Sequence, residues 1–328
     1  HSFPTRRSSD LDITVNGALT STGNGTNLSI YASRNVLVRS TISGASSNPL
    51  NVYLYSSVDK TSYGAVDIAS GDHITTYGGN ITIRGGFGDA SGTCAATYSC
   101  NSGYAVANNN PTTAIGVSII LANLNAGGGN IAIYGRGSST ATTASDGIKT
   151  LGATLSTSGT GTISLYGLGT GAYNGILFGA SGTTGTTISA GTGTITISGT
   201  AASGNTSLFS GVRFDAYSTL TTSGDLTITG TNSVASGNYP AVSIGFDLAG
   251  AGTSTNRASL TVGGDLTINA TGGSRGLVIS GTHTRVAVTG DISITATSTS
   301  GASIWMYGTS QLTSSAGTLS ITATSTSS

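Results

Sequence analysis

Glutamate is missing from this sequence, and all twelve acidic residues are aspartate. Lysine occurs only at Lys60 and Lys149, and charged residues make up 7% of the 328 residues. Because glutamate and lysine are good helix formers, and glycine, serine and threonine are abundant instead, the composition argues against helices. The net charge is zero, so the chain lacks the electrostatic footprint of a partner for nucleic acid or anionic lipid.

Long apolar runs and cysteines are also scarce. The best apolar run, Val117 to Ala122, is far shorter than the ~20 residues of a membrane helix, so we expect no membrane insertion of this segment. The two cysteines, Cys94 and Cys100, share one polar stretch with no other cysteine to compete. We expect a local disulfide formed in an oxidising compartment, with two unpaired thiols as the alternative. A metal site would need further ligands, and no histidine lies nearby.

What the chain does contain is a repeated seven-residue phrase, Gly-x-(Ile/Leu)-x-(Ile/Leu)-x-(Gly/Ala). Its eight copies begin at Gly79, Gly129, Gly161, Gly193, Gly224, Gly264, Gly290 and Gly317, and successive starts lie 26 to 50 residues apart. A short strand repeated at intervals of ~20–50 residues is typical of a solenoid.

The segment from Gly290 to Ala316 illustrates one predicted coil. Three short strands follow one another, at Ile292–Ile294, at Ile304–Met306 and around Leu312, with a corner at Gly308. Residues two apart on a strand point the same way, so the aliphatic residues face inward and the threonines and serines between them face outward. The sequence therefore predicts an all-β fold, a right-handed parallel β-helix (β-solenoid) of roughly ten coils with three short strands per coil.

Two segments stand apart from this repeat. Residues 1–11 resemble the translation of a short-read sequencing adaptor, so we exclude them from the fold as an assembly artefact. Residues 12–328 then form a single β-helix segment, which we expect to be a fragment at both ends. The longest interval holds a loop insertion at about residues 87–113, which includes both cysteines. Function concentrates on such long loops, although a tolerated surface insertion is the alternative.

No set of residues forms a recognisable catalytic, cofactor or metal site. Asp225, Asp265 and Asp291 occupy the second position of the phrase in three consecutive coils, so stacking places them in one column about 5 Å apart. Such a column is close enough to raise pKa values or to hold Ca²⁺. Corner capping through Asx-turns is the favoured interpretation, because other polar residues fill the same slot elsewhere. Those residues are Asn80, Asn130 and Thr162.

Two further places offer candidate contact residues. Arg213 and Asp215 flank Phe214 on a predicted strand, and we expect them to point outward as an exposed ion pair, with substrate contact as the alternative. Trp305 is also expected to point outward, where a tryptophan can stack on sugar rings.

The repeated segments also carry a family resemblance. Gly-Asp-Leu-Thr-Ile-Thr and Gly-Asn-Ile-Thr-Ile, alternating with Leu-Thr-Thr-Ser-Gly, resemble the shaft repeats of filamentous-haemagglutinin-like exoproteins and related autotransporter passenger adhesins of Gram-negative bacteria. The resemblance covers nearly all of residues 12–328. It implies export through an outer-membrane transporter, by autotransport or two-partner secretion, followed by release or display at the cell surface and attachment to a glycan or protein receptor. The family's secretion domain and translocator barrel are not visible, which leaves the export route open.

We therefore expect a non-catalytic shaft or display segment of a large secreted or surface-anchored adhesin. The alternative is a carbohydrate-active β-helix, such as a polysaccharide lyase or glycoside hydrolase, which requires the aspartate column and Arg213 to converge in a groove. Ice binding is a third hypothesis, because outward threonine pairs are similar to the flat faces of ice-binding solenoids. These pairs are Thr194 with Thr196 and Thr227 with Thr229, followed by Thr267 with Asn269 and Ser293 with Thr295.

Overall fold

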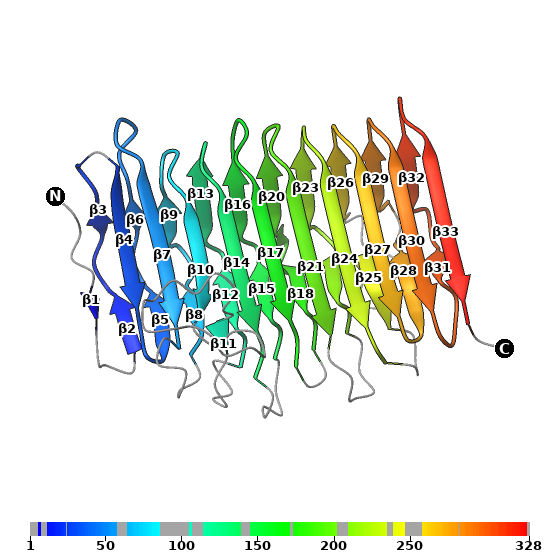
Figure 1. Cartoon of the computed structure of the whole chain (residues 1–328), viewed down its shortest axis with the longest axis horizontal. Helices are drawn as coiled ribbons and strands as arrows, with labels where there is room; N and C mark the ends of the chain where they lie inside the picture. Colours follow the sequence, from blue (N-terminus) through cyan, green and yellow to red (C-terminus); the bar gives the residue numbers. More distant parts are fainter. Residues whose placement is uncertain are drawn as a thin grey trace.

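A computed structural model shows a continuous stack of coils (Figure 1). It describes residues 6–7, 12–23, 25–57, 64–85, 105–106, 114–138, 145–170, 173–201, 209–234, 239–246, 258–281 and 283–326. Within these ranges every regular element is a strand, from β1 to β33, and the strands form three parallel sheets, here called A, B and C. No helix that could cross a membrane occurs in the described ranges.

Each coil contributes one strand to each sheet. Sheet A contains, in order, β1 (Arg6–Arg7), β4 (Thr26–Tyr31), β7 (Leu50–Ser56), β10 (Ile81–Gly85), β14 (Ile131–Arg136), β17 (Ile163–Leu168), β21 (Ile195–Ala201), β24 (Leu226–Asn232), β27 (Leu266–Gly272), β30 (Ile292–Ser298) and β33 (Leu319–Ser325). Sheet B contains β2 (Asp12–Val15), β5 (Asn35–Val38), β8 (Val66–Ile68), β12 (Val117–Ile120), β15 (Ile148–Leu151), β18 (Ile176–Ser181), β22 (Val212–Asp215), β25 (Pro240–Phe246), β28 (Arg275–Ile279) and β31 (Ile304–Met306). Sheet C contains β3 (Leu19–Thr20), β6 (Ile42–Ser43), β9 (His73–Thr75), β13 (Asn123–Gly127), β16 (Thr154–Thr157), β20 (Thr187–Ala190), β23 (Thr219–Thr222), β26 (Ser259–Val262), β29 (Arg285–Val288) and β32 (Gln311–Ser314). Two short strands lie off these paths: β11 (Ala105–Val106) pairs with β14, and β19 (Thr184–Gly185) pairs with β18.

The ten-stranded sheet C confirms the prediction of roughly ten coils with three strands each. In Figure 1 the strands of sheet A run downward at the front, and the fainter strands of sheet C run upward at the back. Successive coils advance to the right, toward the C-terminus. A chain that turns in this sense as it advances is right-handed, which agrees with the general rule for parallel connections.

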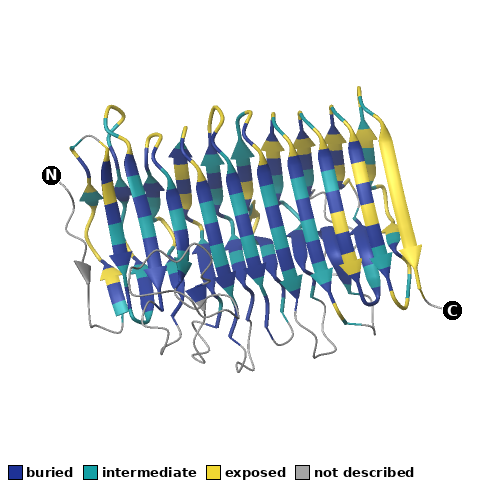
Figure 2. Cartoon of the chain, viewed as in Figure 1, coloured by how far each residue is buried: buried dark blue, intermediate teal, exposed yellow. Residues whose placement is uncertain are grey.

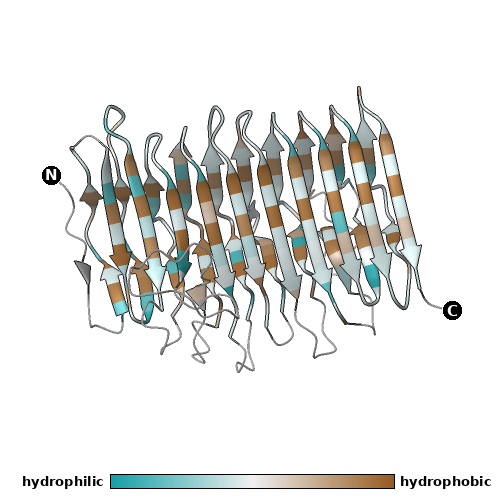
Figure 3. Cartoon of the chain, viewed as in Figure 1, coloured by the Kyte–Doolittle hydropathy of each residue, from teal (hydrophilic) through white to brown (hydrophobic). Residues whose placement is uncertain are grey.

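The inward side chains form a single aliphatic core along the whole stack. Ile228 has no exposed surface, whereas its neighbour Thr227 is half-buried and faces outward, as the alternation predicts. The resulting stripes of buried and partly exposed residues cross the strands of sheet A from β4 to β30 in Figure 2, whereas the last strand, β33, is exposed throughout. Figure 3 shows the matching stripes of hydropathy. Phe178 and Phe214 stack inside the core of neighbouring coils, with ring centroids 4.6 Å apart.

The first glycine of the phrase lies at the corner between sheets C and A. A Cβ atom at Gly129 would clash with the carbonyl oxygen of Gly79 one coil earlier, and a Cβ atom at Gly193 would clash with that of Gly161. Backbone therefore packs directly on backbone at this corner, and only glycine fits there without a shift. Along the stack these glycines form a seam, which we call the glycine seam. Its members are Gly79, Gly129, Gly161, Gly193, Gly224, Gly264, Gly290 and Gly317.

The three corners of a coil differ in how much chain they hold. At the corner between sheets A and B, the shortest connection runs from Gly272 to Arg275 and the longest from Gly85 to Val117, and the latter includes β11 among its described residues. The connections between sheets C and A stay short in every coil, as between Val262 and Leu266. The predicted insertion at about residues 87–113 falls in the longest connection. Apart from β11 it lies outside the described residues, as do Cys94 and Cys100, so their disulfide stays a prediction.

The segment assigned to an adaptor contributes one described element. Arg6 and Arg7 pair in parallel with Ile30 and Tyr31 at the first edge of sheet A. An unpaired sheet edge is a template for any extended chain, so this pairing says nothing about the origin of residues 1–11, and the artefact stays a prediction.

Candidate functional site

The predicted aspartate column exists, and its carboxylates are used to join successive coils. The Oδ1 atom of Asp225 accepts the backbone N–H of Asp265 at 2.9 Å, and that of Asp265 accepts the backbone N–H of Asp291 at 2.8 Å. Asp291 in turn accepts the backbone N–H of Thr318 at 2.7 Å and its hydroxyl at 3.0 Å. The expected Asx-turn is therefore wrong in its partner, because each side chain caps the next coil and not its own corner.

In the earlier coils, asparagine side chains accept the backbone N–H of the next coil in the same way. The Oδ1 atom of Asn51 accepts the backbone N–H of Asn80 at 2.8 Å, Asn80 accepts that of Asn130 at 2.9 Å, and Asn130 accepts that of Thr162 at 2.8 Å. Since a neutral amide and a carboxylate fill the slot alike, the requirement is an acceptor oxygen and not a charge. We call this whole column the corner ladder.

The corner ladder carries charge in its last coils without gathering a metal site. The N–H and hydroxyl of Thr318 hold the pKa of Asp291 below its ordinary value, because both stabilise the ionised carboxylate. Among the residues the structure describes, no group of three or more histidine, cysteine or acidic side chains could hold a metal ion.

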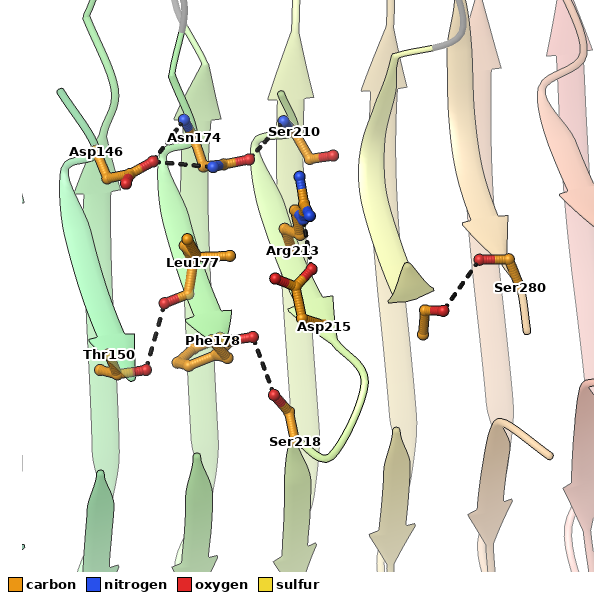
Figure 4. Close-up of polar contacts among 11 residues, drawn as sticks. Asp146, Thr150, Asn174, Leu177, Phe178, Ser210, Arg213, Asp215, Ser218 and Ser280 are labelled. Atoms are coloured by element: carbon orange, nitrogen blue, oxygen red, sulfur yellow. Dashed lines mark hydrogen bonds and ion pairs between the residues drawn. The ribbon is translucent and has the colours of Figure 1, made fainter. Parts of the chain in front are cut away.

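Arg213 and Asp215 form the expected ion pair, with the Nε–H of Arg213 donating to Asp215 Oδ1 at 2.5 Å (Figure 4). The predicted exposure is wrong, because the Arg213 side chain is only 4% exposed. Its neighbour in the same outward column of sheet B, Ser243, is buried as well, so this stretch of the sheet is not a bare surface. A buried charge needs a close partner, and Asp215 supplies it.

These residues do not converge. Asp225, Asp265 and Asp291 line the corner between sheets C and A, whereas Arg213 lies on the outward side of sheet B. The groove that a carbohydrate-active enzyme would require from them is therefore not formed by this set.

Trp305 points outward on β31 as predicted and is 37% exposed. The guanidinium carbon of Arg275, one coil earlier, lies 3.4 Å from its ring centroid, so one face of the indole is already covered by a cation. The ring of Tyr307 lies 4.9 Å away at a tilt. Trp305 thus keeps only part of its surface for an external ligand.

A buried polar ladder was not found from the sequence. Asp146 is 2% exposed, and its Oδ1 atom accepts the backbone N–H of Asn174 at 3.0 Å and the Asn174 side-chain amide at 2.9 Å. Asn174 then accepts the backbone N–H of Ser210 at 2.9 Å (Figure 4). Burial raises the pKa of Asp146, and the bonds from Asn174 oppose that rise only in part. The available signal was a polar residue followed by glycine directly before three successive sheet B strands, as Asp146-Gly147, Asn174-Gly175 and Ser210-Gly211.

A cavity of about 360 Å³ lies at the N-terminal end of the stack. Its lining is mostly aliphatic and includes Ile13, Val15, Leu19, Leu28 and Ile30, which belong to the core of the first coils. Among the residues that the structure describes, no carboxylate, histidine or cysteine lines it. Its described lining is part of the core and brings no reactive groups together.

The outward face of sheet A changes character halfway along. Its early coils carry a tyrosine column in which Tyr31 and Tyr55 stack at 4.9 Å, as do Tyr134 and Tyr166. Arg84 lies between these pairs and donates to the Tyr55 hydroxyl at 2.9 Å. Rings that stack along the axis cover one another's faces, so the column presents edges and hydroxyls, and few open faces remain for a sugar. The later coils carry serine, threonine and one asparagine, Asn269, at the same positions.

Comparisons of the chain with protein-family models, with curated proteins and with solved structures gave no significant match.

Proposed function

We propose that this chain is a non-catalytic shaft and display segment of a large bacterial adhesin, secreted or held at the surface of a Gram-negative cell. The observation that carries the proposal is the single aliphatic core, which runs through all the coils and makes them one rod. Each coil stabilises its neighbours, and the ten strands of sheet C span about 45 Å at ~4.8 Å per coil. Such a rod suits a role in spacing, and the repeat resembles filamentous-haemagglutinin-like shafts.

The unequal corners support the display part of the proposal. Connections of very different length leave the corner between sheets A and B, while the sheet A strands that precede them keep their register. The corner between sheets B and C also holds one long connection, from Phe246 to Ser259. A scaffold with such permissive corners offers variable segments to a receptor at no cost to the stack. The receptor is a glycan or a protein on a host cell or another surface.

The fold also suits export through an outer-membrane transporter. A solenoid forms by adding coils to coils already folded, because most of its contacts are between nearest neighbours. A chain that emerges unfolded from a narrow pore can therefore fold progressively on the far side.

The test is adhesion by the intact chain. Beads coated with the full chain are applied to epithelial monolayers and to a printed panel of neutral, sialylated and sulfated glycans. We expect retention of the beads, and a loss of retention when residues 202–208 or another long connection at the same corner is replaced by one as short as that between Gly272 and Arg275.

Melting curves followed by circular dichroism show whether the shortened variants still fold. The matched control is Thr221→Ala on the outward side of sheet C, which we expect to adhere like the unchanged chain. Absence of retention on every surface, or depolymerisation of a polysaccharide by the intact chain, rejects the proposal.

A further inference from the structure

The last five strands of sheet A carry a regular set of hydroxyl groups on their outward side. Three outward columns cross these strands, and fourteen of their fifteen members are threonine or serine. We call this set the hydroxyl array. The columns are Thr196, Thr227, Thr267, Ser293 and Ser320; Ser198, Thr229, Asn269, Thr295 and Thr322; and Thr200, Thr231, Thr271, Thr297 and Thr324.

The hydroxyl array is periodic in two directions. Each step from β21 to β33 pairs seven consecutive residues with no shift of register. Like residues therefore repeat every ~4.8 Å along the axis and every ~6.7 Å along each strand. Threonine is β-branched and stiff at χ1, so each threonine hydroxyl keeps a well-defined position on this net.

The hydrogen-bonding capacity of the hydroxyl array is directed outward. None of its fifteen side chains is buried, and within the part of the chain that the structure describes none has a hydrogen bond to another protein group. Some outward hydroxyls on sheet C differ, since Thr219 donates to Thr187 at 3.2 Å. The hydroxyl array is thus free to bind an ordered external partner.

The hydroxyl array carries no formal charge and no aromatic ring. A polyanion needs cationic side chains to bind, and a sugar gains most of its affinity from stacking on an aromatic face. Both kinds of residue occur on the same face in the earlier coils, as Arg84 and Tyr134, but not in the array. The chemistry of the array therefore matches a neutral partner made of hydroxyl-like donors and acceptors.

From these features we propose that the hydroxyl array binds the surface of ice. One hydroxyl gains little by exchanging liquid water for another partner, because a net hydrogen bond contributes only about 0.5–1.5 kcal/mol. Many hydroxyls on a rigid net gain together when the partner is itself a lattice. The oxygen atoms of ice repeat on a net with spacings of the same order, and waters ordered over the array can join that lattice.

This inference is independent of the proposed adhesin role. A chain that does not adsorb to ice can still be a display shaft, and a chain that adheres to no cell can still adsorb to ice.

The experiment uses the full chain labelled with a fluorophore and a slowly growing ice hemisphere, together with thermal hysteresis. We expect the chain to be incorporated into the ice. We also expect it to stop the growth of ice crystals at temperatures between the melting point and a lowered freezing point. Thr229→Tyr places a bulky ring within the net and is expected to abolish both signals. Asn269→Thr completes the one irregular row and is expected to increase both.

The matched control is Thr221→Tyr, the same change on an exposed outward position of sheet C in β23. We expect it to adsorb like the unchanged chain, and equal melting curves show that all variants are folded. Exclusion of the unchanged chain from ice overturns the proposal. So does an equal loss in Thr229→Tyr and Thr221→Tyr, or retention on insoluble cellulose or chitin in place of ice.

Discussion

The two halves of the outward face of sheet A have the same backbone arrangement. They differ in whether their outward side chains stack on or hydrogen-bond to other protein groups. In the early coils Tyr134 and Tyr166 stack on one another, and Arg84 is tied to Tyr55. In the later coils the side chains of Thr229 and of the rest of the hydroxyl array form no hydrogen bond to another protein group among the described residues. The inward side is the same in both halves, with Ile133 and Ile228 equally buried. The repeat therefore constrains the core, and leaves the outward face free to acquire separate roles.

The largest expected effect comes from breaking what the two halves share. Ile228→Asp places a carboxylate in the core and should lower the free energy of unfolding by about 4 kcal/mol or more, because the charge has no partner there. Thr227→Asp changes the adjacent outward position and should cost far less. Circular dichroism melts compare the two, and equal losses would show that the assigned facing of the strand is wrong.

A smaller effect, with a defined pH dependence, is expected at Asp146. Its pKa is raised in the folded state, so the folded chain binds this proton more tightly than the unfolded chain. The stability associated with it is complete below the unfolded pKa and is lost as pH rises through the raised folded value. Asp146→Asn keeps the acceptor oxygen for Asn174 and should be more stable than the unchanged chain at neutral pH, with a flatter profile. Denaturant titrations between pH 3 and pH 8 measure this, and a profile unchanged by the substitution contradicts it.

The two halves should respond differently to truncation to alanine. Tyr166→Ala removes a stacked ring and should cost about 0.5–1.5 kcal/mol beyond the lost buried area. Thr229→Ala, at an equivalent position in the later coils, should stay within about 0.5 kcal/mol of the unchanged chain. Chemical denaturation gives both values. A cost at Thr229 as large as that at Tyr166 would mean that the threonine half is also stabilised by its outward side chains.

The smallest expected effect concerns the corner ladder, which both halves share in different chemical forms. Asp265→Ala removes the acceptor for the N–H of Asp291 and should cost about 0.5–1 kcal/mol, since the site is exposed. Asp265→Asn restores the form used by Asn80 and Asn130 and should be nearly neutral. Thermal melts of the pair decide between a need for an acceptor and a need for a charge.

The sequence was sufficient for the architecture because inward positions repeat strictly. The alternation around Ile228 predicted its burial, the outward position of Thr227 and the parallel pairing, and all three are confirmed. The aspartate column followed from the same repeat. Its hydrogen-bond partner did not, since a local turn and a bond to the next coil leave the same sequence pattern.

What could not be predicted depends on contacts outside the repeat. The burial of Arg213 reflects its surroundings on sheet B, which no periodicity encodes. Asp146 looks like an ordinary loop residue before a glycine, and only the stacking of Asn174 against it reveals a buried carboxylate. The receptor and the export route that we propose are likewise not encoded in the repeat.

The glycine seam has a mechanical consequence. At the glycine seam the backbone of one coil contacts the backbone of the next directly, as at Gly129 against Gly79. The seam therefore fixes the smallest spacing between successive coils on that side of the rod. A second glycine contact of the same kind lies at the corner between sheets A and B, where a Cβ atom at Gly175 would meet the carbonyl oxygen of Gly211. A methyl group added at the seam would act as a wedge, and several in succession would bend a straight rod into an arc whose curvature electron micrographs could measure.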